Sequence, residues 1–232
     1  MATETPDVYH PYGSEPPGSA SLLQVASRSV PGSQHPYQDR VLVDEKLGLF
    51  AVADGVSLSS QGSGGIAASL ALSLLRENFK GDIVRAIEDT HRIIAARKAE
   101  DWNIGETTLT AVAVKDHTLQ AGNVGDSSAY LVRRGEMQSL VQEDKSKWGH
   151  LTQVIGFPED VRVHSTSIEL KDEDTVIVAS DGVGHVLWPS LMETITPKPN
   201  VEEVADAIIE EAKARKVGYN DDKSVLVLRV VT

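Results

Sequence analysis

Apolar residues recur along this chain with two different spacings. In three segments they return every three or four positions, which predicts amphipathic helices with one buried face. The second of these helices should cover residues 82–101, and the third should cover residues 201–214. The first helix is expected to bury Ile66, Ala67, Leu70, Ala71, Leu74 and Leu75.

Elsewhere the apolar residues form short runs of strand length, separated by turn signals. The clearest run is 47–54, LGLFAVAD. Further strands are expected at 107–114, 118–123, 129–133, 161–170, 175–180 and 224–231. Because strands and helices do not alternate regularly, the pattern favours antiparallel sheet covered by helices over a parallel doubly wound sheet.

The first 20 residues differ from the rest of the chain. They contain four prolines and no apolar periodicity, and they lack the basic start and apolar stretch of a signal peptide. We therefore expect a flexible leader over 1–20 and a single catalytic domain over 21–232.

The composition of the chain argues against several classes of partner and of active site. The 232 residues carry a formal net charge of −12, which argues against a nucleic-acid partner. No apolar run is long enough to cross a membrane. The absence of cysteine excludes disulfides, thiolate metal sites and thiol catalysis. We expect a cytoplasmic monomer.

Aspartates stand where several of the predicted strands begin or end. Asp54 and Asp181 each follow an apolar strand and precede a glycine. Asp-Gly is also an ordinary turn signal, so any one of these residues could be only a turn former. If the aspartates converge, however, they would form an oxygen-donor site suited to Mg²⁺ or Mn²⁺ rather than Zn²⁺.

Seven segments, taken in order, resemble the metal-dependent serine/threonine protein phosphatases of type 2C, the PPM family, in their compact bacterial form. They are YQDR, AVADG, GETTLTAV, GNVGDSSAYLVRRGE, LTQVIG, VIVASDG and DDKSVLVL. The resemblance implies an α+β fold: a four-layer α-β-β-α sandwich of two antiparallel sheets flanked by helices. It also implies a centre of two Mn²⁺ or Mg²⁺ ions.

The resemblance assigns roles to individual residues. Asp54 would bridge both metals, and the Gly55 carbonyl would bind one of them. Asp181 and Asp221 would complete the shell of the other metal. Asp39 would act at the edge of the site through water. Asp126, together with Asp181, matches the pair that holds a third, weaker metal in bacterial members.

The implied reaction is hydrolysis of phosphoserine or phosphothreonine in a partner protein. A hydroxide bridging the two metals would attack phosphorus, with no phosphoenzyme. The catalytic residues would be Asp54, Asp181 and His35.

Four departures from the family pattern bear on this reading. Val56 stands where some members carry a histidine proposed as general acid, which leaves His35 and His185 as candidates. Gln34 stands where the family has a phosphate-binding arginine. Gln34 and His35 could take over that contact, with Arg28 and Arg40 as alternatives.

The other two departures concern loops. The segment 140–151 is short where relatives carry a mobile flap. Asp222 replaces the asparagine that usually follows the ligand aspartate, so either Asp221 or Asp222 could be the ligand, and the motif favours Asp221. These departures keep two alternatives open: a catalytically weak module that binds a phosphorylated partner, and a structural metal-binding protein.

Overall fold

Two β-sheets form the centre of the computed structural model, which describes residues 8–9, 23–33, 36–56, 62–184, 190–214 and 220–231. The first sheet has the order β1-β3-β4-β5-β6-β9 and the second has the order β2-β11-β10-β7-β8. All pairings within the two sheets are antiparallel except that of β1 with β3, which is parallel.

The strands of the first sheet are β1 (Val8–Tyr9), β3 (Arg40–Asp44), β4 (Leu49–Ala53), β5 (Leu109–Lys115), β6 (Thr118–Val124) and β9 (His164–Glu169). Those of the second are β2 (Leu23–Val30), β7 (Ser128–Arg133), β8 (Glu136–Ser139), β10 (Thr175–Ala179) and β11 (Lys223–Val230).

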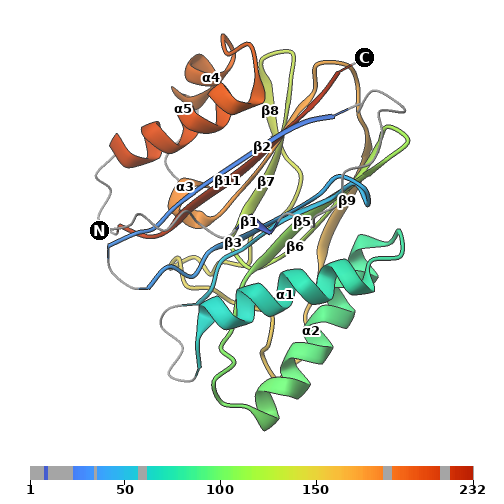
Figure 1. Cartoon of the computed structure of the whole chain (residues 1–232), viewed down its shortest axis with the longest axis vertical. Helices are drawn as coiled ribbons and strands as arrows, with labels where there is room; N and C mark the ends of the chain where they lie inside the picture. The colour runs from blue at the N-terminus through green and yellow to red at the C-terminus, as the bar shows by residue number, and fades with distance from the viewer. Residues whose placement is uncertain are drawn as a thin grey trace.

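Helices cover the outer face of each sheet (Figure 1). Helices α1 (Gly64–Asn78) and α2 (Ile83–Glu100) pack on the first sheet, and α5 (Val201–Ala214) packs on the second beside the short α3 (Asp181–Gly184) and α4 (Ser190–Ile195). A third apolar cluster fills the space between the two sheets. The predicted four-layer α-β-β-α sandwich is therefore confirmed.

Strand β4 shows why its sequence is almost continuously apolar. Successive side chains of a strand point to opposite faces of the sheet. Ala51 packs toward α1 and α2, whereas Phe50 and Val52 pack into the core between the sheets. Both faces of β4 are thus buried, and the chain leaves this rigid strand at Asp54.

The predicted positions of the three helices agree with the structure, but the predicted buried face of α1 is partly wrong. Helix α5 has the predicted bounds, and α1 and α2 lie where expected. Ile66, however, is 48% exposed, so its expected burial is wrong. Helix α1 instead buries Ala68 and Leu72, because the buried stripe is rotated toward them.

Most of the predicted leader lies outside the described residues; within 1–20, only Val8 and Tyr9 are described, and they form β1. No helix in the described ranges is long and apolar enough to cross a membrane.

Candidate metal centre

Strand pairing brings the predicted aspartates to one end of the two sheets. Arg40 lies opposite Ala53, so Asp39 before β3 and Asp54 after β4 stand at the same edge. In the second sheet Ala179 lies opposite Val225, which places the end of β10 beside the start of β11. Asp181 and Asp221 flank these two strand ends, and Asp126 lies between β6 and β7.

Two threonines fix the backbone of Asp54. The amide of Thr108 and the hydroxyl of Thr107 both donate to the Asp54 carbonyl, over 2.8 and 2.9 Å. The Asp54 amide donates in turn to Oγ1 of Thr108. The GETT segment therefore holds the end of β4 in place, a role that the sequence alone did not reveal.

A close approach of two backbones fixes the next residue. A Cβ on Gly64, the first residue of α1, would lie 2.5 Å from the carbonyl carbon of Gly55. No side chain fits in that space, so glycine is required there. The Asp54–Gly55 segment is thereby held between the start of α1 and Thr107, which pairs with Gly55 just before strand β5.

Asp39 is fully buried at the edge of this group. The Ser180 hydroxyl donates to its Oδ2 over 2.8 Å. Its Oδ1 has no hydrogen-bond partner among the described residues. Burial raises the pKa of the Asp39 carboxyl to about 7, with the charges of Asp222 and Asp181 adding to the rise. Such an orphaned carboxylate oxygen fits a site that receives a cation.

The carboxyl of Asp54 is perturbed in the same direction as that of Asp39. Burial raises its pKa well above the ordinary value, and the charges of Asp39, Asp181, Asp221 and Asp126 raise it further. Like charges this close disfavour one another's ionisation, and a bound divalent cation would relieve that repulsion.

The donor set therefore fits hard divalent cations, since every converging group is a carboxylate or a backbone carbonyl. Within the described ranges, no three acidic or histidine side chains are already grouped tightly enough to hold a metal. The carboxylates are thus gathered at one end of the sheets without forming a closed coordination shell.

Asp221 and Asp222 have different surroundings. The Asp222 carboxylate is buried and accepts hydrogen bonds from the backbone amides of Gly32 and Gln38, each over 2.6 Å. Asp221 is partly exposed, and its negative charge raises the pKa of Asp54. Asp222 therefore ties Gly32 and Gln38 to the start of β11, whereas the charge of Asp221 contributes to the raised pKa of Asp54.

Asp126 has a partner that the sequence did not suggest. The Lys145 ammonium lies 3.1 Å from its Oδ2, and both side chains are largely buried. Lys145 belongs to the short 140–151 segment. A cation of the chain itself therefore contacts the carboxylate that was expected to hold a third metal.

Several predicted residues lie outside the described part of the chain: Gln34, His35 and His185. Of the alternative phosphate contacts, Arg28 pairs with Asp206 of α5 through two hydrogen bonds. Arg40 stays next to the acidic group, since its Nη1 donates to the Asp39 carbonyl over 2.7 Å.

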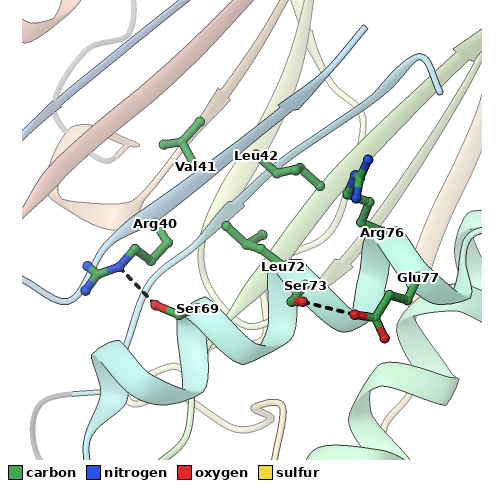
Figure 2. A pocket seen from close by; sticks show the side chains of 8 residues that line it. All are labelled: Arg40, Val41, Leu42, Ser69, Leu72, Ser73, Arg76 and Glu77. Atoms are coloured by element: carbon green, nitrogen blue, oxygen red, sulfur yellow. Dashed lines mark hydrogen bonds between the residues drawn. The ribbon is translucent and has the colours of Figure 1, made fainter. Parts of the chain in front are cut away.

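A groove of about 340 Å³ begins at Arg40 and runs between β3 and α1 (Figure 2). Arg40 donates to Ser69, and Ser73 donates to Glu77 further along. Arg76, which also lines the groove, pairs with buried Asp44. With two guanidinium groups and one carboxylate in its lining, this groove is not the metal centre but a neighbouring surface.

The structure defines a two-sheet protein with a group of acidic side chains at one edge of the sheets, and comparison with known proteins identifies its family. The sequence model of protein phosphatase 2C matches residues 28–217. Because this match covers most of the chain, the protein belongs to the protein phosphatase 2C family, in its bacterial type, and is a phosphoric monoester hydrolase.

The individual relatives have low sequence identity to this chain, but the alignments cover most of both proteins. The chain is 24% identical over 218 residues to serine/threonine phosphatase stp of Listeria innocua, covering 79% of this chain and 85% of the relative. It is 26% identical over 242 residues to probable protein phosphatase 2C 58 of Arabidopsis thaliana, and the match covers 85% of this chain and 84% of the relative.

Among solved structures, the catalytic domain of the serine/threonine protein phosphatase PstP in complex with two manganese ions is 26% identical. Its TM-score is 0.76, and the match covers 90% of this chain and 99% of that one. The Mycobacterium tuberculosis phosphatase PstP/Ppp has a TM-score of 0.78 at 23% identity, and the match covers 90% of this chain and 99% of that one. This match shows a similar fold.

Proposed function

We propose that this chain hydrolyses phosphoserine and phosphothreonine in partner proteins with the help of Mn²⁺ or Mg²⁺. The observation that carries the proposal is the gathering of acidic side chains around Asp54, whose pKa is raised first by burial and then by four neighbouring carboxylates. The manganese ions of the related PstP structure support the same donor chemistry.

In this proposal Asp54 and the Gly55 carbonyl, with Asp181 and Asp221, would hold the cations. Bound there, divalent cations would acidify a water molecule and neutralise the charge that develops on the phosphoryl oxygens. Thr107 and Thr108 would keep the Asp54 backbone in position, and Asp39 would lie at the edge of the centre with one oxygen available.

Binding of the phosphate and protonation of the leaving group need further residues. Arg40 is the described cation next to Asp39, so it is our candidate for the phosphate contact together with Gln34 and His35. Val56 carries no titratable group, so His35 and His185 remain the candidates for the general acid.

The test is steady-state hydrolysis of p-nitrophenyl phosphate and of a phosphothreonine peptide, with Mn²⁺, with Mg²⁺ and with EDTA. We expect activity with Mn²⁺ that EDTA abolishes and that Asp54→Ala lacks. Asp172→Asn, at an exposed position, is the control and should keep full activity.

Two results would contradict the proposal. Activity that persists in EDTA would exclude metal dependence. A folded, Mn²⁺-loaded protein that binds the phosphothreonine peptide without hydrolysing it would instead be the phosphate-binding module considered from the sequence.

A further inference from the structure

The ion pair between Lys145 and Asp126 has consequences for the number of metals in the centre. The Lys145 Nζ lies 3.1 Å from Oδ2 of Asp126, and the two side chains are 19% and 11% exposed. A charge pair with so little exposure is only weakly screened by solvent, and separating it would leave a carboxylate buried without compensation.

The position of Lys145 is set by a network around its neighbour Asp144. The Asp144 amide donates to the Gly125 carbonyl over 2.8 Å, and the Gly125 amide donates back to Oδ2 of Asp144 over 2.9 Å. Gly125 directly precedes Asp126 in the chain. Residues 144–145 and 125–126 are therefore joined side by side, which places the ammonium at the carboxylate.

The same network ties this segment to the first sheet. Oδ1 of Asp144 lies 2.8 Å from Nε2 of His164 in β9 and accepts a hydrogen bond from Gln153 over 2.7 Å. The Thr152 amide donates to the Asp144 carbonyl. The short 140–151 segment is thus anchored through Asp144, the residue directly before Lys145, so the lysine is not carried by a free loop.

The chemistry at Asp126 differs from that expected of a third metal ligand. An ammonium and a divalent cation compete for the same oxygens, because each neutralises the carboxylate and repels the other. The charge of Asp126 is one of those that raise the pKa of Asp54. Because Lys145 pairs with Asp126, its positive charge lies at the border of the acidic group.

We propose that the Lys145 ammonium takes the place of a third metal, so that this chain binds two divalent cations and Asp126 is not a ligand. This inference rests on the proposed function, since it presupposes the centre at Asp54. Lys145 then acts as a positioning residue, one that holds Asp126 neutralised whether or not divalent metal is present.

The number of bound ions tests this directly. Mn²⁺ binding to the full chain would be measured by equilibrium dialysis with metal analysis, alongside the free Mn²⁺ signal in electron paramagnetic resonance. We expect two Mn²⁺ per chain for the wild type and three for Lys145→Met, which keeps the linear side chain but removes its charge. Lys147→Met is the matched control, because Lys147 lies over the Trp148 ring nearby, and it should still bind two.

Asp126→Asn provides an independent variant should Lys145→Met fail to fold. If Asp126 is not a ligand, the asparagine variant keeps two Mn²⁺ and the wild-type increase in melting temperature with Mn²⁺. Three ions in the wild type, an unchanged two in folded Lys145→Met, or loss of an ion in Asp126→Asn would each overturn the inference. No binding at all by the wild type would instead contradict the proposed metal centre itself.

Discussion

Oδ2 of Asp222 accepts a hydrogen bond of 2.6 Å from the backbone amide of Gln38, although 184 positions separate the two residues in sequence. This contact joins the start of the last strand to the loop that delivers Asp39. It gives Asp222 a structural role, whereas the charge of its neighbour Asp221 contributes to the raised pKa of Asp54.

The two neighbouring aspartates should therefore respond differently to substitution. Asp222→Asn replaces one acceptor oxygen by an amide donor facing backbone N–H groups, which should cost about 1–3 kcal/mol of unfolding free energy. Asp221→Asn should leave the metal-free stability almost unchanged but reduce the stabilisation by Mn²⁺. Thermal unfolding in EDTA and in Mn²⁺ measures both effects, and equal losses in EDTA would contradict the assignment.

Asp54→Asn should separate charge repulsion from metal binding. Without metal the variant should be at least as stable as the wild type, because one member of a repelling buried group loses its charge. With Mn²⁺ the wild type should gain about 4 kcal/mol at a thousandfold excess over Kd, and the variant much less. Asp172→Asn serves as the exposed control. A variant with the wild-type Mn²⁺ response would show that Asp54 is not a ligand.

The two glycines that begin α1 form a matched pair. A Cβ on Gly64 would lie 2.5 Å from the backbone of Gly55, whereas one on Gly65 would come no closer than 3.5 Å to the Arg40 guanidinium. Gly64→Ala should therefore displace the Asp54–Gly55 segment and lower both stability and phosphatase activity. Gly65→Ala should be neutral or stabilising by up to about 1 kcal/mol. Denaturant unfolding and p-nitrophenyl phosphate hydrolysis would distinguish them, and equal behaviour would refute the close-contact argument.

His91 should make the protein less stable in mild acid. Burial lowers the pKa of its imidazole, which lies 3.1 Å from the Glu159 carbonyl and accepts from the Gly156 amide. Below about pH 6.5 the unfolded chain takes up a proton at this histidine that the folded chain resists, so the contribution of His91 to stability falls as pH falls, opposite in sign to that of the Asp39 carboxyl. Urea unfolding at pH 7.5 and 5.5 measures this loss.

The control for this pH dependence is the variant His91→Gln, which removes the titrating group. It should be less stable overall and lose less stability between the two pH values than the wild type does. An identical pH dependence in both proteins would show that His91 does not contribute.

Much of the fold could be predicted because its signals are local. The apolar run of β4 and the stripe of α5 each follow from the periodicity of the element itself. Strand β8, with exposed and half-buried residues only, has no such pattern and was missed. Ile66 was misplaced because its apolar side chain fitted the helical spacing, although the packed face of α1 is formed by its neighbours.

The acidic centre was only partly predictable for a related reason. An aspartate at the end of an apolar strand is visible in the sequence, and strand pairing then brings several of them together. Which partner each one meets depends on contacts between distant segments. Neither the Lys145–Asp126 pair nor the loop closure by Asp222 leaves a periodic or compositional signal.

Strand β1 covers part of an edge of the first sheet. Val8 and Tyr9 pair with Val41 and Leu42, so part of the outer edge of β3 is already hydrogen-bonded. An uncovered edge strand offers its backbone to any other chain and is a common starting point for aggregation. Loss of residues 1–9 would expose that edge, and preparations of the shortened chain should therefore form oligomers at concentrations where the full chain does not.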